Sequence, residues 1–572
     1  MVFPYHLMTA ISVAGSYLVS SGRIPQIPSL SFLTCFAALW ATQFLLWAVW
    51  AVILYPKVFS PLRGLPEPSG NSWFMGQFPT IRRLRTGEPM IEWMNSIPND
   101  GLIRYLGPLN MERLVPTSPK ALAEVLATKN YDFPKPSHFR HTIGRILGVG
   151  LLLAEGDEHK VQRRNLLPAF GFRHIKDLYP VFWKKASEGV EAMTQQILQD
   201  AAQASGEAKT AVFEAGGWAS RITLDIIGVA GLGRDFGAIK DPNNELSKAY
   251  WRLFAPNRQA RILNLLELVI PPRLISALPV RRNFDIRSAA RFIRGVCAEL
   301  IEDKEKSLGR KDSVDLDILS VALQSGGFTR EDLIDQLMTF LAAGHETTAS
   351  ALTWAAYLLA KNPDMQARLR AEVRAHLPPP TTTTTTTTAA AAAAAAGDVG
   401  DDQPHATVSS IDIDRMPYLN AFCNEVLRYF SPAPMTVRVS AVDTTILGHF
   451  VPKGTQIMIV PWAINKSRAL WGADAHVFNP DRWLDGSGRF VASGGAASNY
   501  AFMTFLHGPR SCIGQAFARA ELACLVASWV GRFALELRDE ELADEEKLVI
   551  KGGLTARPAN GMHLRATVLD GW

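Results

Sequence analysis

Hydrophobic positions dominate the N-terminus of this chain, where the first 56 residues contain a single charged side chain, Arg23. From Leu30 to Tyr55 an uncharged run rich in Leu, Ala, Phe and Trp continues for 26 residues. As a helix this run would be about 39 Å long, which is enough to cross a hydrocarbon core of about 30 Å with some tilt. The pattern therefore predicts a transmembrane anchor over residues 30–55, preceded by an N-terminal segment over residues 1–29.

Two other interpretations of the N-terminus compete with a single anchor. A secretory signal would have an apolar region of about 7–15 residues and a small-residue cleavage site, but this run is longer and no such site follows it. The weaker apolar stretch Tyr5–Val19 fits a second span, an interfacial segment or a short lumenal N-terminus. Basic residues after the anchor predict that the C-terminal part faces the cytoplasm; they are Lys57, Arg63, Arg82, Arg83 and Arg85.

The remaining pattern predicts one mainly α domain with a small β portion over residues 66–572. Prolines in a hinge over residues 56–65, and just beyond it, indicate a stiff, extended spacer between the membrane and this domain. Two regions have the alternation of short strands: Leu102–Val115, and Thr444–Val460 with a turn at His449–Phe450. The length alone would suggest three or four domains of about 150 residues, but the patterns favour one.

A long apolar helix is predicted after Thr329, which begins a sequence resembling a capping box with Asp332. The helical period continues to Asn362-Pro363, so the element would have roughly 30 residues and a length of about 45 Å. The polar patch Gly344–Thr348 interrupts its apolar face. An exposed stripe would explain that patch without any function, whereas a buried one needs partners or a chemical role.

Two further segments attract attention but are given no chemistry. Residues 378–402 are a low-complexity stretch with eight threonines and eight alanines in succession, which predicts a solvated surface insertion. The glycines after Ile222–Ala230 resemble a dinucleotide-binding turn, but their spacing is G-x-G-x-x-x-G and no strand–helix–strand unit is evident. We interpret that stretch as a buried helix ending at glycines.

Charge and cysteine content exclude several classes of protein. The chain has 59 Lys and Arg against 54 Asp and Glu, a formal net charge of +5 over 572 residues, so no bulk binding to nucleic acid is indicated. Its five cysteines are scattered and include no C-x-x-C pair. A disulfide framework and a cysteine-based zinc site are therefore not expected, and the catalytic part is expected in a reducing compartment.

One cysteine, Cys512, has an unusual neighbourhood. It lies in the segment Phe505–Gly514, between Gly508 and Gly514, two residues after Arg510 and just before an apolar, helix-forming run. A helix N-terminus and a nearby cation both favour a thiolate. A thiolate can act as a nucleophile if a histidine base is present, or as the axial ligand of haem iron. A buried structural cysteine is the alternative that an isolated cysteine would normally favour.

The segment around Cys512 resembles the haem-binding signature F-x-x-G-x-R-x-C-x-G of the cytochrome P-450 superfamily at every fixed position. Three further signatures of that family are matched in the same order. They are the oxygen-activation motif at Ala343–Thr348, E-x-x-R at Glu425–Arg428, and the P-E-R-F region at Phe478–Trp483, where Asp481 replaces the usual Glu. The resemblance extends from about Pro66 to the C-terminus and implies the cytochrome P-450 fold.

The resemblance implies a role for each matched residue. Cys512 would be the thiolate ligand of haem b, with Phe505, Gly508 and Gly514 shaping the loop. Arg510, Arg438 and Arg163 would bind the haem propionates, and His159 stands where the family commonly has Trp. Thr347 would hydrogen-bond dioxygen while Glu346 helps to relay protons. Glu425 and Arg428 would form a structural network with Arg482.

The implied activity is that of a membrane-anchored haem-thiolate monooxygenase of fungal type. It would take electrons from NADPH-cytochrome P-450 reductase, use O2, and face the cytoplasm at the endoplasmic reticulum. The segments implied to line the pocket, such as Tyr131–Gly150 and Pro434–Val437, are mostly apolar, which favours a lipophilic substrate. The resemblance to fungal members of the family implies a role in secondary metabolism. A non-oxygenating isomerase or dehydratase, a membrane haem sensor or carrier, and a cysteine-nucleophile hydrolase are the competing functions.

Overall fold

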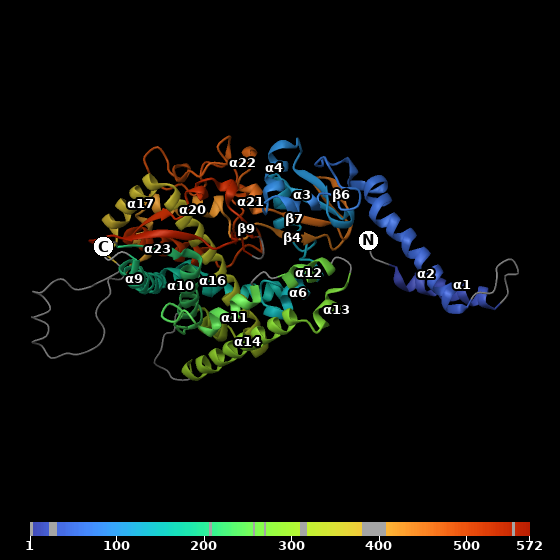
Figure 1. Cartoon of the computed structure of the whole chain (residues 1–572), viewed down its shortest axis with the longest axis horizontal. Helices are drawn as coiled ribbons and strands as arrows, with labels where there is room; N and C mark the ends of the chain where they lie inside the picture. The colour runs from blue at the N-terminus through green and yellow to red at the C-terminus, as the bar shows by residue number, and fades with distance from the viewer. Residues whose placement is uncertain are drawn as a thin grey trace, which may run out of the picture.

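A computed structural model describes residues 4–21, 31–204, 209–254, 258–267, 270–308, 317–379, 408–551 and 555–572. The chain forms a helical body with small sheets at its edges, and N-terminal helices project from one end (Figure 1). The predicted fold class, mainly α with a small β portion, is confirmed. The low-complexity segment falls almost wholly outside the described residues.

The projecting part is a pair of helices. The helix α2 (Phe32–Val49) continues into the π-helix η1 (Trp50–Phe59) and the 3₁₀-helix η2 (Pro61–Gly64), so that 33 residues form one apolar helix long enough to cross a membrane. The helix α1 (Tyr5–Ser20) lies beside α2 (Figure 1). The Gln43 amide of α2 donates a hydrogen bond to Ser12 Oγ of α1 at 2.9 Å, so a polar contact joins the two helices.

The expectation of an extended spacer after the anchor is wrong. Pro56 lies inside η1 and is buried, and residues 61–64 are helical as well. Because Pro56 has no N–H, it leaves the Val52 carbonyl four residues earlier without its helical donor, and the Asn110 side chain donates to that carbonyl at 2.8 Å. Arg104 donates to the carbonyl of Pro56 itself at 2.5 Å. A proline is tolerated inside a helix where a wider turn and a neighbouring side chain take up the disturbed hydrogen bonds.

Two sheets account for most of the β structure. The first has the order β1 (Leu102–Leu106), β2 (Glu112–Pro116), β7 (Gln456–Ile459) and β4 (Thr436–Val439), with β2 and β7 parallel and the other pairs antiparallel. The second has the order β3 (Thr210–Glu214), β11 (His563–Val568) and β8 (Phe533–Leu537). Two small hairpins pair β5 (Thr444–Ile446) with β6 (His449–Val451), and β9 (Ile550–Lys551) with β10 (Arg557–Pro558).

Both predicted strand regions therefore exist, but the expected turn is displaced. The turn between β5 and β6 is made by Leu447 and Gly448, which have φ angles of 51° and 81°, whereas His449 and Phe450 belong to β6. Positive φ at two successive residues is what a tight two-residue hairpin requires, and glycine adopts it at little cost.

The helix α16 (Arg330–Lys361) crosses the body and organises it. Thr329 and Asp332 form the predicted capping box, and Asn362 ends the helix before Pro363. It packs against α10 (Ala215–Ile226), α14 (Arg281–Leu308) and α23 (Gln515–Arg532). Most of its length is buried, so α16 and α23 form the centre of the core. The stretch with dinucleotide-like glycines is indeed helical and buried, in α10 and η6 (Ile227–Gly231).

The other helices surround this centre, with α14 along one edge of the body and α17 near the C-terminus (Figure 1). Those of eight or more residues are α4 (Glu88–Ser96), α6 (Ser137–Leu147), α7 (Gly156–Leu166), α9 (Tyr179–Ala204), α11 (Glu245–Phe254), α12 (Arg258–Leu266), α17 (Pro363–His376) and α20 (Pro417–Tyr429). The shorter α-helices are α3 (Phe78–Arg83), α5 (Pro119–Ala123), α8 (Phe172–Asp177), α13 (Pro272–Ala277), α15 (Ile318–Gln324), α19 (Ser410–Asp414), α21 (Pro461–Ile464) and α22 (Arg468–Trp471). Short 3₁₀ and π turns complete the chain at η3 (Pro108–Asn110), η4 (Glu124–Thr128), η5 (Leu167–Phe170), η8 (Pro480–Trp483), η9 (Asn499–Ala501), η10 (Glu540–Ala543) and η11 (Glu545–Lys547).

Candidate functional site

The loop that carries Cys512 is held tightly in front of α23. The amide of Cys512 donates a hydrogen bond to the Phe505 carbonyl at 2.8 Å, and this bond closes the loop on itself. Gly508 has a φ of 78°, and a Cβ atom there would lie 2.1 Å from the Leu126 carbonyl oxygen. Only glycine can therefore occupy position 508, because its backbone contacts another backbone directly.

The thiol of Cys512 is accessible, whereas the other four cysteines of the chain are buried. It lies deep enough that burial raises its pKa, while the amide of Gly514 and the charge of Arg163 act in the opposite direction. The sequence analysis considered the helix start and its nearby cation, and in this structure burial outweighs both. A thiol that is accessible, fixed by its loop and surrounded by protein is suited to bind a ligand from inside the fold.

The structure brings the four predicted cationic or polar residues to this region. Arg163 of α7 donates hydrogen bonds to the Ser511 carbonyl at 2.7 Å and to the Ser511 hydroxyl at 3.3 Å, next to Cys512. Arg438 of β4 and Arg510 of the loop are both buried. His159 of α7 is buried too, and burial together with the charges of Arg510 and Lys135 lowers its pKa to about 4, so this imidazole is neutral at pH 7.

Two residues of this cluster were missed by the sequence analysis. Lys135 lies between two prolines just before α6, and Glu155 is the residue before α7. Glu155 forms an ion pair with Arg510, accepts a hydrogen bond from the Lys135 amide at 2.9 Å, and lies 3.7 Å from Lys135 Nζ. No local motif marks either position, because the residues with which they interact belong to β4 and to the Cys512 loop, which are distant in sequence.

The cluster contains more buried positive charge than its one carboxylate can balance. Arg510 Nε and Nη1 and His159 Nδ1 are buried and have no hydrogen-bond partner. Burial and the neighbouring charge of Arg438 lower the pKa of Lys135 to about 7, which shows how crowded the cations are. Unpaired buried donors of this kind fit an anionic ligand, and the two propionates of a haem whose iron meets Cys512 would supply it.

The polar patch of α16, a helix that packs against α23, is not an exposed stripe. His345 and Thr348 are buried, and Gly344, Glu346 and Thr347 are half-buried. The Thr347 hydroxyl donates to the Ala343 carbonyl at 2.8 Å, which leaves its lone pairs available. A Cβ atom at Gly344 would lie 3.0 Å from Ile227, so this glycine allows close packing of α16 on η6.

Glu346 has a partner that the sequence analysis did not find. Arg557 of β10 binds its carboxylate at 2.5 Å, and the Thr555 hydroxyl lies 3.4 Å from the same oxygen. The Arg557 side chain is 34% exposed, so the pair reaches from α16 towards the surface of the protein. Glu346 is therefore tied to the C-terminal strands and is not a free carboxylate.

Glu425, Arg428 and Arg482 form a buried network, with Glu425 and Arg428 fully inaccessible. Arg428 donates two hydrogen bonds to Glu425 at 2.7 Å and three more to the carbonyls of Asn465, Ala475 and Val477. All five of its N–H donors are thereby used. Glu425 also accepts from Arg482 at 3.1 Å and from Trp483 at 2.9 Å, which ties α20 to the loop before the Cys512 segment.

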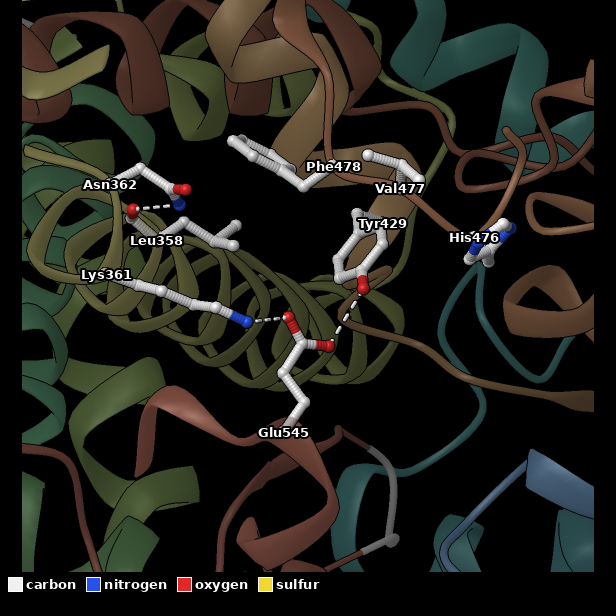
Figure 2. A pocket seen from close by; sticks show the side chains of 8 residues that line it. All are labelled: Leu358, Lys361, Asn362, Tyr429, His476, Val477, Phe478 and Glu545. Carbon is white, nitrogen blue, oxygen red and sulfur yellow. Dashed lines mark hydrogen bonds and ion pairs between the residues drawn. The ribbon is translucent and has the colours of Figure 1, made fainter. Parts of the chain in front are cut away.

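A cavity of about 300 Å³ lies elsewhere, where the ends of α16 and α20 meet η11 (Figure 2). Lys361 and Tyr429 both bind Glu545 there, at 2.7 and 2.8 Å. Leu358 and Phe478 supply apolar wall, and His476 stands at one side (Figure 2). Its charged groups already pair with one another, so we interpret this region as a structural contact between elements. None of the residues that line the cavity belongs to the Cys512 cluster.

Comparisons with known proteins agree with this geometry. The sequence model of the cytochrome P450 family matches residues 66–564. The chain is similar to cytochrome P450 monooxygenase sphH of Aspergillus fumigatus, with 45% identity over 92% of this chain and 91% of that protein. It is also similar to cytochrome P450 monooxygenase FUM15 of Gibberella moniliformis, with 44% identity over 90% of each chain, and to cytochrome P450 monooxygenase ALT8 of Alternaria alternata, with 40% identity over 92% of this chain and 93% of that protein. The accessible thiol, the buried cations and these matches together make the chain a haem-thiolate monooxygenase that belongs to the cytochrome P450 family.

Proposed function

We propose that this monooxygenase hydroxylates or epoxidises a lipophilic small molecule in secondary metabolism. One observation carries the assignment of the reacting centre: an accessible thiol, Cys512, in a loop fixed by Gly508, next to buried cations that have no partner. The apolar segments around the cluster support a lipophilic substrate, since such ligands are bound mainly by hydrophobic side chains.

Each residue of the site has a distinct task in this proposal. Cys512 would supply the thiolate ligand of the haem iron, and Arg163 would orient it through the adjacent Ser511. Arg510, Arg438 and neutral His159 hold the propionates, and Phe505, Gly508 and Gly514 keep the loop in place. When bound, haem supplies the activation of dioxygen and the cleavage of its O–O bond.

Proton delivery is assigned to Thr347 and Glu346. The Thr347 hydroxyl can accept a hydrogen bond while it donates to Ala343, so it can hold a proton donor at a defined place. Glu346 is adjacent to Thr347 in α16, and its partner Arg557 is partly exposed, so the Glu346 carboxylate can exchange protons with solvent. A positioned group of this kind contributes about 10²- to 10⁴-fold to a proton-transfer step.

The N-terminal helices are assigned to the membrane of the endoplasmic reticulum. The apolar helix Phe32–Gly64 is long enough to span it, and the basic residues that follow favour a cytoplasmic body. There the body would meet NADPH-cytochrome P-450 reductase. Because Gln43 of α2 would otherwise expose its amide to lipid, its hydrogen bond to Ser12 supports α1 as a second embedded helix rather than a lumenal tail.

Expression with a reductase in microsomes tests this function. We expect the reduced protein with carbon monoxide to have a red-shifted Soret band, and a lipophilic library to yield products that contain one atom of ¹⁸O from ¹⁸O2. Product formed without consumption of NADPH would instead indicate an isomerase or dehydratase. Haem binding without turnover on any compound would favour a sensor or carrier.

A further inference from the structure

Lys135 and Glu155 belong to the same buried cluster as Arg510 and Arg438, although no family motif includes them. The side chains of Lys135 and Glu155 are only 10% and 12% exposed, and that of Arg510 is 4% exposed. Charged groups are rarely buried to this degree unless a partner compensates them. Glu155 is the one carboxylate of this cluster, so the function of Lys135 and Glu155 depends on which ligand binds in the site.

The backbone holds Lys135 in this place. The Val439 amide donates to the Pro134 carbonyl at 2.9 Å, and the Ala441 amide donates to the Asp132 carbonyl at 2.8 Å. These bonds fasten the segment before Lys135 to the end of β4, which carries Arg438. Prolines on both sides of Lys135 restrict its backbone further. Lys135 is thus presented beside Arg438 by a stiff segment.

Glu155 connects Lys135 to Arg510. It accepts a hydrogen bond from the Lys135 amide at 2.9 Å, while its second oxygen pairs with Arg510. Arg510 nevertheless keeps two donor nitrogens unpaired. Glu155 therefore orients the guanidinium without using all of its donors, and the remaining ones are free for another acid.

The formal charges of the cluster suggest which ligand it matches. With Lys135 protonated, Lys135, Arg438 and Arg510 contribute three positive charges and Glu155 one negative charge, which leaves +2. An anionic ligand beside Lys135 would raise its lowered pKa and so favour this protonated form. His159 is neutral, because its pKa is lowered to about 4. Arg163 and Arg140 also act on this cluster, through His159 and Lys135 respectively. They are left out of the count because Arg163 donates its hydrogen bonds to Ser511 and Arg140 donates to the Leu153 carbonyl. Two carboxylates bring the cluster to neutrality, and haem has two propionates.

We propose that Lys135 is an additional propionate-binding residue and that Glu155 is a fixed counter-anion that matches the charge of this site to the haem. The proposal rests on the haem site described above. It makes Glu155 a positioning residue that acts through Arg510, whereas Lys135 touches the cofactor itself. The pair would then set both the retention of haem and its reduction potential, because a nearby positive charge stabilises the reduced, more negative centre.

Charge substitution in the full-length holoenzyme tests the proposal. Glu155→Gln leaves one positive charge uncompensated, so we expect the reduction potential to become more positive. Lys135→Gln removes a positive charge and a charge-assisted hydrogen bond, so we expect a more negative potential and about tenfold faster transfer of haem to excess apomyoglobin. The double variant Lys135→Gln/Glu155→Gln restores the net charge, and its potential should return close to the wild-type value although both contacts are lost.

Matched controls lie on the surface of α7. The exposed pair Lys160 and Asp157, 2.8 Å apart, allows the same changes of charge as Lys160→Gln and Asp157→Asn, and solvent should screen their effect. Lys135→Arg keeps the charge and should retain the slow haem transfer of the wild type. This variant reports on Lys135 even if the Glu155 variants fail to fold.

The outcomes separate this proposal from the haem-thiolate assignment. Opposite shifts of the two single variants, cancelled in the double variant, support the proposal, because general damage to the fold would accumulate and not cancel. Shifts no larger than those of the surface controls, or shifts of the same sign, would overturn it. If the wild-type protein itself lacks the red-shifted carbon monoxide band, the assignment of Cys512 as the haem ligand is overturned instead.

Discussion

At the scale of single residues, Cys512 differs from every other cysteine of the chain because its thiol is accessible. Cys512→Ala removes the only sulfur that the loop presents, so the reduced variant with carbon monoxide should lose the red-shifted Soret band of thiolate ligation. Cys423→Ala, at a buried cysteine of α20, is the control and should keep the band. Persistence of the band in Cys512→Ala would mean that another residue is the ligand.

The hydroxyl of Thr347 provides a second prediction at this scale. Thr347→Ala should retain haem, carbon monoxide binding and substrate affinity, because its hydroxyl bonds only to the carbonyl of its own helix. Without a positioned hydroxyl, protons are delivered less effectively to the reacting oxygen. The amount of product per NADPH should therefore fall severalfold while the amount of hydrogen peroxide rises. Thr347→Ser should recover much of the coupling.

A matched control for Thr347 stands further along α16. Thr353 makes the same type of bond, donating to the Ala349 carbonyl at 2.7 Å. Thr353→Ala therefore removes an equivalent helix contact, and its ratio of product to NADPH should stay unchanged. If Thr347→Ala is as well coupled as this control, Thr347 only packs the helix, and proton delivery belongs to Thr348 or to Glu346.

Residues of the candidate site could be predicted from the sequence where a local motif contains them. Cys512, Gly508 and Arg510 lie within one short segment, so the resemblance of that segment to the haem-binding signature implies their roles. Lys135, Glu155 and Arg557 were not predictable, because each acts on a partner that is distant in sequence. The ion pair between Arg557 and Glu346, for example, joins residues 211 positions apart, and only the folded chain brings them together.

At the scale of elements, α20 is tied to the loops that follow it by Arg428, whose five donors are all used. Arg428→Lys keeps the charge but cannot reproduce this planar set of bonds. We expect unfolding to become easier by about 1–3 kcal/mol, since a lysine leaves buried carbonyl acceptors of Asn465, Ala475 or Val477 without a donor. Denaturant unfolding of the holoenzyme and its haem content measure the effect.

The matched control for Arg428 is Arg368→Lys on α17. Arg368 forms an ion pair with Asp481 at 2.8 Å, but both side chains are at least half exposed. An exposed pair is worth about 0–1 kcal/mol, so this variant should be nearly as stable as the wild type. Equal stability of the two variants would show that the buried network does not support the fold.

Some features of these elements are specified by residues that are adjacent in sequence, whereas others depend on distant residues. The ends of α16 were predicted because a capping box and a proline act on adjacent residues. The extended hinge was predicted wrongly, because the helix around Pro56 is completed by the side chains of Asn110 and Arg104, which are about 50 residues away in sequence. The turn at Leu447–Gly448 was placed two residues late, since the strand pattern alone does not specify the register of a short hairpin.

A prediction at this scale concerns the connection between α17, which ends at His376, and α19, which begins at Ser410. Deleting Pro379–Asp402 should leave haem content and activity nearly intact. The segment is homopolymeric, and changing the length of a loop costs only about 0.6 kcal/mol per doubling. Haem content per protein and product formation measure the outcome, and loss of haem incorporation would contradict the surface-insertion interpretation.

At the scale of the whole molecule, the proposed function assigns catalysis to the body and membrane anchoring to the N-terminal helices. Removing residues 1–55 deletes α1 and α2, so the truncated protein should leave the membrane at least in part on carbonate washing. Removing residues 1–21 deletes α1 alone. This shorter truncation should keep the protein in the membrane, because the apolar helix from Phe32 remains.

The shorter truncation also tests the pairing of the helices. Without α1 the Gln43 amide loses its bonds to Ser12 and Met8 and keeps the one to the Leu39 carbonyl of its own helix. Part of the amide then faces hydrocarbon, where an unsatisfied polar group is costly. Extraction should then need less detergent than for the full chain, and adding Gln43→Leu to the truncation should restore firm anchoring. If the protein without residues 1–55 stays fully in the membrane, the body itself binds lipid. The apolar side chains exposed on α12 and α13, Ile262, Leu266 and Leu274, are then the first surface to mutate, since apolar area exposed on neighbouring helices is what a membrane can cover.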